Sequence, residues 1–357
     1  MEVDKNFIVD TNITETDIEW FDIRTEPFSI HGVFFDEEYG CFLRMPQKVA
    51  DSVSPKVAVL NHYSSGGRVR FSTDSDYIAI YAEFGELIGK PVMTLAGESG
   101  FDLYKNGRFY RLFTPPYDIG NSYASERRVK KELADYEIYM PLYREVRSLK
   151  IALRKGAKLL PAKEYSRKTP VVFYGSSITQ GACASRPGIN YVNTLCRKLD
   201  TEFINLGWSG ACKGEMPMME YLASLDMSVF VYDFDHNVSN SQELLEKHMV
   251  FYKAFRNRCP DVPVIMATAP DRVMWGGDFD TRREIIYQNY LAAKSMGDNV
   301  YYLDQITKTF EGYPTMGFAS FAPYSALIDR SFDYRSLYVG LACVLVFFLI
   351  ARKTVFS

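Results

Sequence analysis

The stretch Val171-Val172-Phe173-Tyr174-Gly175-Ser176-Ser177 decides the fold of this chain. Four large apolar residues run without a break into a Gly-Ser-Ser turn, a pattern typical of a strand buried on both faces of a parallel sheet. Gly175 permits the sharp turn that must follow such a strand. Because open α/β sheets bind ligands at the carboxyl ends of their strands, the hydroxyl of Ser177 is the candidate nucleophile.

Strand and helix patterns alternate after this stretch. Such alternation indicates right-handed crossovers and a doubly wound parallel sheet, which predicts an α/β/α domain over residues 169–304. Ser241 is expected to cap one of the helices. The expected strands are 171–174, 203–206, 229–232, 262–268 and 300–303, and the expected helices are 190–199, 216–225, 241–258 and 281–295.

The first 160 residues have a different pattern. Short β runs divided by turn residues, without helical periodicity, favour an N-terminal β-sandwich over residues 1–160. Residues 64–67 and 105–107 have the turn chemistry of hairpins. A basic stretch at 155–168 without strand signals predicts a linker. The clearest expected strands are 57–60, 69–72, 77–81 and 107–112.

Composition excludes several classes of protein. Hydrophobic residues make up 47% of the 357 residues and charged residues 24%, which indicates a globular chain. The net charge is -3 and no basic cluster suits a phosphate backbone, so we expect no nucleic-acid partner. The six cysteines form no C-x-x-C pair and no metal-ligand spacing, so we expect free thiols, a reducing compartment and no metal. No secretory signal opens the chain, which predicts a cytoplasmic body.

Three loops that follow successive strands carry groups suited to acyl transfer. The first holds Ser177, the second ends at Gly210, and the third ends at Asn237. Acyl transfer needs a nucleophile and two or three N–H donors aimed at the developing oxyanion. The backbone N–H groups of Ser177 and Gly210 and the side-chain amide of Asn237 would supply those donors. His62, before a Gly-Gly turn, and His236, beside Asn237, are candidate substrate-binding residues.

These residues resemble the SGNH (GDSL-type) hydrolase superfamily. Gly175–Thr179 is similar to the first sequence block of that family, with Ser176 in place of the usual Asp, and Gly210 and Asn237 match the second and third. Residues 100–104, Gly-Phe-Asp-Leu-Tyr, resemble the GxDLY-type domain that precedes some SGNH esterase domains. The resemblance implies a flavodoxin-like fold and ester hydrolysis, often deacetylation of sugars, without metal or cofactor.

The fourth block of the family, Asp-x-x-His, has no match in this sequence. The last expected strand runs into Asp304 and Gln305, and no histidine occurs beyond His248. A serine hydroxyl needs a base within hydrogen-bond reach, and removing that base costs a factor of roughly 10⁴ to 10⁶. His248 falls on the apolar face of a helix, and neighbours such as His236 and Asn237 point opposite ways in an extended segment. We therefore expect impaired catalysis.

The C-terminal tail, residues 305–357, differs from the rest of the chain. Residues 337–351 are uncharged and almost wholly apolar, between Arg335 and Arg352. A helix of that length spans roughly 22 Å, short of the ~30 Å hydrocarbon core of a membrane. Three interpretations stay open: a membrane-associated helix, a buried core helix, and a reading frame altered after residue 305, which would also explain the missing histidine.

Two functional hypotheses follow from these patterns. The first is a serine esterase that acts on a small acyl ester such as an acetylated sugar, with impaired activity. The second is a non-catalytic carbohydrate-binding or membrane-tethered protein derived from that family. The sequence leaves the acyl group, the alcohol and the oligomeric state open.

Overall fold

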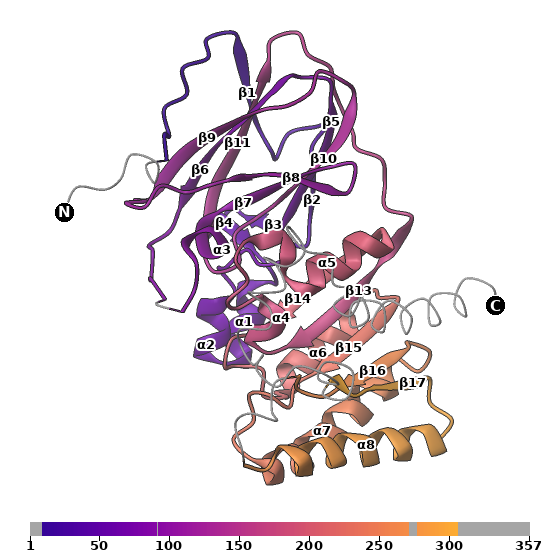
Figure 1. Ribbon diagram of the computed structural model, residues 1–357. Coiled ribbons are helices and arrows are strands. Elements are labelled where there is room, and N and C mark those ends of the chain that lie inside the picture. Colours follow the sequence, from indigo (N-terminus) through magenta and orange to yellow (C-terminus); the bar gives the residue numbers. More distant parts are fainter. Residues whose placement is uncertain (1–8, 91, 271–276, 306–357) are drawn as a thin grey trace, which may run out of the picture. The chain divides into compact units, whose positions relative to one another are not determined.

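The computed structural model describes residues 9–90, 92–270 and 277–305, which fall into two compact units (Figure 1). Most of the chain before Arg167 belongs to the first unit, and most of the chain from Arg167 onward belongs to the second. Two short segments are exceptions. Ala184–Asn193 belongs to the first unit although it follows Arg167 in the chain, and Lys48–Ala58 belongs to the second. Hereafter unit 1 is the described part of residues 9–47, Val59–Ser166 and Ala184–Asn193, and unit 2 is the described part of Lys48–Ala58, Arg167–Cys183 and residues 194–305.

Unit 1 is the predicted antiparallel β-sandwich. One sheet has the strand order β1-β11-β6-β9, and the other has the order β12-β5-β10-β7-β8, with β2 paired to β5. Buried apolar side chains from both sheets, such as Ile80, Ile151, Phe71 and Ile138, share one core. The strands are β1 (Ile18–Asp22), β2 (Ser29–His31), β3 (Phe34–Asp36), β4 (Cys41–Leu43), β5 (Arg68–Thr73), β6 (Tyr77–Phe84), β7 (Phe101–Lys105), β8 (Arg108–Phe113), β9 (Ser122–Arg128), β10 (Ala134–Tyr139), β11 (Val146–Arg154) and β12 (Leu159–Leu160).

The expected strand at 57–60 is wrong, because these residues lie in a helix, α2 (Pro55–Leu60). Proline is favoured in the first turn of a helix. The hydroxyl of Ser54 accepts a hydrogen bond from the Val57 N–H at 3.2 Å, which satisfies one of the donors of that first turn. An apolar run of four residues fits a buried helix as well as a strand, so these end signals decide the structure. The other short helices of this region are α1 (Gln47–Val53) and α3 (Leu95–Ser99).

The two expected hairpin turns have different outcomes. The turn at 105–107 joins β7 to β8, with positive φ at Asn106 (49°) and Gly107 (74°), so this prediction is confirmed. The turn at 64–67 leads from α2 into β5 and joins no pair of adjacent strands, so that prediction is wrong. The expected linker at 155–168 is also partly structured, because Leu159 and Leu160 pair with β5.

Unit 2 is the predicted doubly wound sheet. Its five parallel strands have the order β14-β13-β15-β16-β17, so the chain begins in an inner strand and winds outward in both directions. Helix α7 packs between α6 and α8 (Figure 1). The elements are β13 (Arg167–Gly175), α4 (Ser177–Gln180), α5 (Tyr191–Leu199), β14 (Thr201–Gly207), α6 (Met216–Ser224), β15 (Val229–Asp233), α7 (Ser241–Arg258), β16 (Val264–Ala267), α8 (Phe279–Ser295) and β17 (Val300–Leu303). The 3₁₀ turn Pro187–Ile189 and the first three residues of α5 lie in the segment that belongs to unit 1.

The N-cap of α7 is Asn240, one residue before the expected Ser241. The Asn240 side-chain oxygen accepts a hydrogen bond from the Glu243 N–H at 2.9 Å. Asn caps a helix at least as well as Ser, so two adjacent candidates could not be separated by residue type alone.

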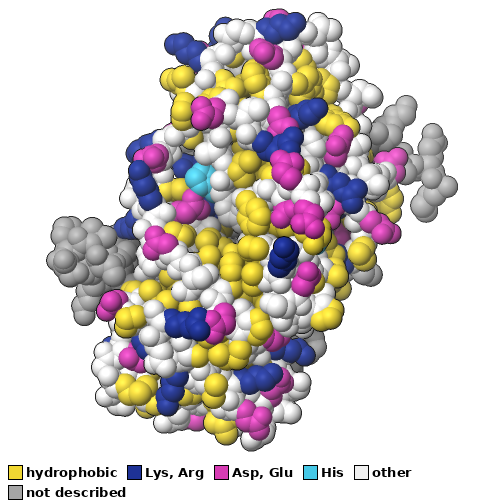
Figure 2. Space-filling view, turned by 180° about the vertical axis from the view of Figure 1, so that it is seen from behind, with side chains coloured by type: hydrophobic (Ala, Val, Ile, Leu, Met, Phe, Trp, Pro, Cys, Tyr) yellow, Lys and Arg dark blue, Asp and Glu magenta, His cyan; other side chains and the backbone are white. Residues whose placement is uncertain are grey.

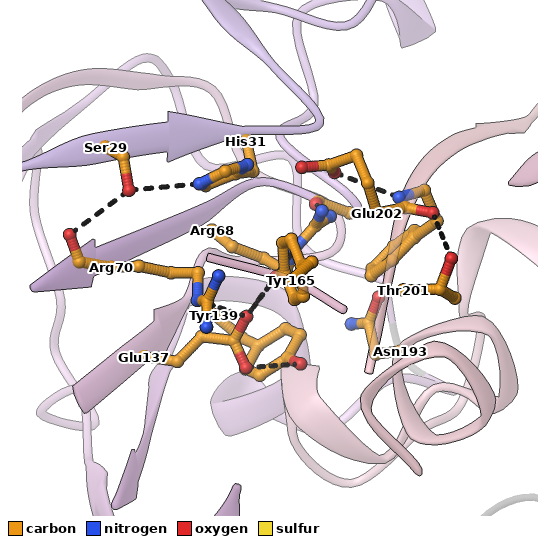
Figure 3. A network of polar contacts seen from close by, with 12 residues as sticks. Ser29, His31, Arg68, Arg70, Glu137, Tyr139, Tyr165, Asn193, Thr201 and Glu202 are labelled. Carbon is orange, nitrogen blue, oxygen red and sulfur yellow. Dashed lines mark hydrogen bonds and ion pairs between the residues drawn. The ribbon is translucent and has the colours of Figure 1, made fainter. Parts of the chain in front are cut away.

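Unit 1 buries charged groups inside its sheets. Arg68 on β5 is fully buried and donates to the hydroxyl of Tyr165 at 3.0 Å (Figure 3). Tyr165 donates in turn to the carboxylate of Glu137 on β10, which also accepts from Tyr139 at 2.8 Å. Burying a charge without a partner is costly. The charged groups of Arg68 and Glu137 are therefore buried beside Tyr165 and Tyr139, whose hydroxyls hydrogen-bond to them.

The GxDLY motif forms a second buried ion pair in unit 1. The carboxylate of Asp102, which is fully buried, accepts hydrogen bonds from Arg186 at 2.7 Å and from the Gly188 N–H at 2.8 Å. The Tyr104 hydroxyl accepts from Arg186 at 3.0 Å. The motif therefore holds Ala184–Asn193, the chain segment that follows the Ser177 turn in sequence.

On the face drawn in Figure 2, acidic and basic side chains are interspersed, without a broad region of one sign. Among the described residues, no helix has the length and apolar character needed to cross a membrane. The apolar segment 337–351, on which the expected membrane contact depends, lies outside the described residues.

Candidate active site

Three neighbouring strands of the unit 2 sheet end at the same level, at the carboxyl end of the sheet. Gly175, the last residue of β13, pairs with Gly207 at the end of β14 and with Asp233 at the end of β15. The loops that carry Ser177, Gly210 and Asn237 therefore leave the sheet at the same level. Because β14 and β15 lie on opposite sides of β13, this edge is the topological switch point, where doubly wound sheets bind ligands.

Ser177 lies on a tight turn between β13 and α4. It is the first residue of the short helix, and its residue surface is 9% exposed. The hydroxyl of the preceding Ser176 caps the helix by accepting from the Ile178 N–H at 3.2 Å. A Cβ at Gly175 would lie 2.0 Å from the hydroxyl oxygen of Thr179, so only glycine fits there. Ser176, which replaces the family's usual Asp, therefore serves as a helix cap here.

The second loop is fixed directly to the serine turn. The Ser209 N–H donates to the side-chain oxygen of Gln180 at 3.0 Å, and the Asn205 amide donates to the Thr179 carbonyl at 2.8 Å. A Cβ at Gly207 would lie 2.1 Å from the backbone nitrogen of Gln180. This close approach sets the position of the second loop relative to α4.

Gly210 combines an unusual backbone with a cationic neighbour. Its φ of +65° is in the left-handed region that favours glycine. A Cβ at this position would lie 2.5 Å from the ammonium nitrogen of Lys56 on α2, a residue of the same unit. A positive charge therefore lies beside the glycine whose N–H is the predicted oxyanion donor.

Asn237 is fixed to the second loop and to the helix behind it. Its side-chain oxygen accepts a hydrogen bond from the Cys212 N–H at 3.3 Å, which orients the amide. The buried Arg282 of α8 donates to the carbonyls of Asp235 and Val238 at 2.9 and 3.0 Å, on either side of Asn237. The Asp235 carboxylate accepts from the Ala269 N–H at 3.0 Å, which closes the loop onto the end of β16.

The histidines lie in different environments. His248 is 1% exposed, its Nδ1 accepts a hydrogen bond from the Asn289 side-chain amide at 3.0 Å, and burial lowers its pKa to about 3. It is therefore a neutral core residue at physiological pH. His236 is half-buried beside Asn237, and His62 contacts Glu145 and Cys41 in unit 1. Substrate contacts by His62 and His236 stay predictions.

The fourth block would begin near Asp304, immediately after β17. Asp304 is half-buried, and the Gln305 N–H donates to the Thr268 hydroxyl at 3.1 Å. The residues from 306 onward lie outside the described part of the chain. The sequence itself holds no histidine there.

Several residues that support the site were not predicted. Asn205 lies in β14 between the apolar residues Ile204 and Leu206, and a polar side chain in that setting could have indicated a bridging role. Gln180 ends α4 between Thr179 and Gly181, and its neighbours give no such signal. Arg282 gives no such signal, because it lies 47 residues from Asp235 and contacts carbonyl groups, which every residue carries.

Two family models match the chain, one for each part. Residues 168–302 match the model of the GDSL-like lipase/acylhydrolase family, and residues 18–159 match the model for the N-terminus of SGNH-hydrolase-type esterases. No curated protein sequence matches the chain significantly.

Solved structures share the arrangement of the elements. A protein described as a GDSL-like lipase from Bacteroides ovatus has 26% identity and a TM-score of 0.72 over 83% of this chain and 89% of its own. The salicylyl-acyltransferase SsfX3 of a tetracycline biosynthetic pathway has 16% identity and a TM-score of 0.68 over 85% and 89%. The acetyl xylan esterase Est2A from Butyrivibrio proteoclasticus has 13% identity and a TM-score of 0.55 over 96% and 100%.

The fold and the matches define an acyl-esterase type of protein with a serine turn at the switch point of its sheet. The resemblance to the SGNH (GDSL-type) hydrolases is confirmed. The chain combines a GxDLY-type N-terminal domain with a GDSL-like α/β domain.

Proposed function

We propose that this protein is a serine esterase that hydrolyses small acyl esters, with acetyl groups on carbohydrates as its substrate class. Ser177 attacks the ester carbonyl, and the oxyanion is held by the N–H groups of Ser177 and Gly210 and the amide of Asn237. The acetyl xylan esterase of B. proteoclasticus and a family two carbohydrate esterase from Cellvibrio japonicus, at a TM-score of 0.59, support the choice of substrate class.

One observation carries this proposal: three loops are joined at the carboxyl edge of the sheet by hydrogen bonds between neighbours. Ser209 contacts the serine turn through Gln180, and Cys212 contacts Asn237. A nucleophile, a backbone donor with positive φ and an oriented amide donor are thereby held on one sheet edge. Acyl transfer requires this combination.

The proposal includes slow turnover. The serine of an esterase is activated by a base, and the sequence has no histidine in the block where the family carries it. His248 does not substitute, because it is buried and its pKa is about 3. We expect the rate to lie roughly 10⁴ to 10⁶ below that of an enzyme with the base, with the oxyanion donors still contributing.

The test compares hydrolysis of 4-nitrophenyl acetate by the native chain, Ser177→Ala and Ser176→Ala. We expect a slow, enzyme-dependent rate that Ser177→Ala abolishes and that Ser176→Ala, the matched change one residue earlier, reduces only through the weakened cap. Added imidazole should raise the native rate more than that of Ser177→Ala, because it supplies the missing base. Release of acetate from acetylated xylan then tests the substrate class.

The missing base favours one alternative, a non-catalytic carbohydrate-binding or membrane-tethered protein. In that case native and Ser177→Ala proteins give equal rates with and without imidazole. Retained binding of an acetylated xylo-oligosaccharide by both proteins would then support a binding function.

A further inference from the structure

Three potential metal ligands converge in unit 1, and none of them is among the proposed nucleophile and oxyanion donors, Ser177, Gly210 and Asn237. They are the thiol of Cys41 on β4, the Nδ1 nitrogen of His62 after α2, and a carboxylate oxygen of Glu145 just before β11. His62 Nδ1 lies 3.5 Å from the Cys41 sulfur and 2.8 Å from Glu145 Oε2, and all three ligand atoms lie within 4.8 Å of one another. Cys41 is fully buried, and the other two are half-buried.

The cluster does not have the geometry of a catalytic triad. In a triad, one ring nitrogen of the histidine faces the nucleophile and the other faces the carboxylate. Here the same nitrogen, Nδ1, faces both the Cys41 sulfur and the Glu145 oxygen. Three donor atoms within 4.8 Å of one another, two of them in contact with the same ring nitrogen, suit a cation better than proton relay.

We propose that Cys41, His62 and Glu145 form a binding site for a divalent transition-metal ion, with Zn²⁺ as the best-matched cation and water as the fourth ligand. Thiolate, imidazole and carboxylate are the ligands that Zn²⁺ takes in proteins. Ordinary Zn–S and Zn–N bonds in a tetrahedron place sulfur and nitrogen about 3.6 Å apart, which matches the observed separation of 3.5 Å. His62 Nδ1 and Glu145 Oε2 are now 2.8 Å apart, which is a hydrogen-bond distance. This separation would have to increase to about 3.4 Å for both atoms to bind Zn²⁺.

The surroundings of the cluster hold the ligands in place. Arg147 donates to the other oxygen of Glu145 at 2.6 Å, which leaves Oε2 directed at His62. The ring of Tyr39 packs edge-on against His62 with centroids 5.7 Å apart. A Cβ at Gly85 would lie 2.6 Å from Glu145 Oε1, so glycine makes room for the carboxylate. Such outer contacts orient the ligands of protein metal sites.

The charges of the site also suit a divalent cation. Cys41 loses its thiol proton to solvent when the metal binds, and the His62 ring keeps its proton on Nε2 while Nδ1 binds the metal. A thiolate and a carboxylate then neutralise the two positive charges of Zn²⁺. The metal site is argued from its own three residues and does not rest on the esterase reaction.

The test is Zn²⁺ titration of the chelator-treated full chain in competition with a chromophoric chelator, followed by Co²⁺ substitution. We expect about one tightly bound Zn²⁺ per chain and, with Co²⁺, a thiolate-to-metal charge-transfer band. Glu145→Gln, which keeps the size of the side chain, should weaken Zn²⁺ at least about 10-fold, and Cys41→Ser should weaken it more and remove the band. Cys183→Ser, a half-buried thiol outside the cluster, is the matched control and should change neither.

Three results would overturn the proposal: no binding at micromolar Zn²⁺, a Co²⁺ complex without the thiolate band, or an affinity unchanged by Glu145→Gln. Should Cys41→Ser fail to fold, the band in the native chain and the Glu145→Gln titration still decide. In either case, Ser177-dependent hydrolysis is measured separately, so the two proposals fail independently.

Discussion

The two units differ in where they place their polar side chains. In unit 2 the polar groups of the candidate site lie near the carboxyl ends of strands and in the segments that follow them. Asn205 lies near the end of β14, Thr179 in α4 and Asn237 in the loop after β15, while β16 and the first four residues of β15 are apolar. In unit 1 charged groups lie within strands, as Arg68, Glu137 and Asp102 do. A parallel sheet covered on both faces leaves only its edges for chemistry, whereas the antiparallel sandwich pairs distant charges inside its fold.

The difference has an energetic consequence. Buried charges in unit 1 depend on each other across long stretches of chain, 84 residues for Asp102 and Arg186. In unit 2 the site depends on close backbone packing, with glycines where a methyl group would collide. Mutations should therefore destabilise unit 1 by leaving charges unpaired and should disturb unit 2 by displacing loops.

The largest expected effect is on unit 1. Asp102→Ala leaves the buried guanidinium of Arg186 without its carboxylate and the Gly188 N–H without its acceptor, so we expect about 3–5 kcal/mol of lost unfolding free energy. Urea denaturation measures this. Asp22→Ala removes the partner of Arg24 in an exposed ion pair and should cost less than about 1 kcal/mol. Equal costs for the two variants would contradict the role given to burial.

A methyl group at Gly207 tests the packing of unit 2. Gly207→Ala places a Cβ 2.1 Å from the backbone nitrogen of Gln180, so α4 must shift, and we expect a destabilisation of about 1–3 kcal/mol. Thermal unfolding measures the cost. Gly89→Ala, where a Cβ meets nothing within 4 Å, is the control and should stay within about 0.5 kcal/mol. A Gly207→Ala protein as stable as the control would show that this contact is not required.

Arg282 tests how the third loop is held. Arg282→Met removes the donors to the carbonyls of Asp235 and Val238, and the loop that carries Asn237 should loosen. We expect kcat for 4-nitrophenyl acetate to fall about 10-fold, or about 1.4 kcal/mol, with KM little changed, because the oxyanion donor acts in the transition state. Arg282→Lys keeps one donor and should recover part of the rate. A change in KM alone would contradict this positioning role.

The last prediction is a pH dependence of stability from His248, which is small over any one pH unit. Burial lowers its folded pKa to about 3 from an ordinary value of 6.5, so below that ordinary value the unfolded chain takes up a proton that the folded chain does not. Stability should fall as pH drops from about 6.5 toward 3, by up to about 1.4 kcal/mol per pH unit. His248→Leu should lose this part of the slope, measured by urea denaturation at several pH values. An unchanged slope would mean that other groups produce it.

Much of unit 2 could be predicted because its signals are local. An unbroken apolar run identifies a buried parallel strand, and the loops that follow successive strands must share a sheet edge whatever the details of packing. The candidate residues could therefore be named from their order along the chain. The contacts that orient them, such as the hydrogen bond from Arg282 to the Asp235 carbonyl, depend on which helix packs behind which loop. A local sequence pattern does not predict this tertiary packing.

Unit 1 was harder to predict for a related reason. The run at 57–60 is too short to distinguish strand from helix, and its outcome depends on the cap at Ser54 and on Pro55. The cluster of Cys41, His62 and Glu145 has no sequence spacing typical of a metal site, because its residues come from a hairpin strand, the segment after a helix and the residue before β11. The expectation of no metal rested on cysteine spacing and on the family resemblance, and the proposed Zn²⁺ titration tests it.

A crystal structure that resolves the serine turn and the third loop would measure the separation of the two proposed site residues directly. We expect the Ser177 hydroxyl oxygen to lie within about 6 Å of the Asn237 amide nitrogen, since a reacting carbonyl must lie about 3 Å from each. A separation well beyond about 10 Å, or an Asn237 amide that faces away from the serine, would contradict a shared acyl pocket.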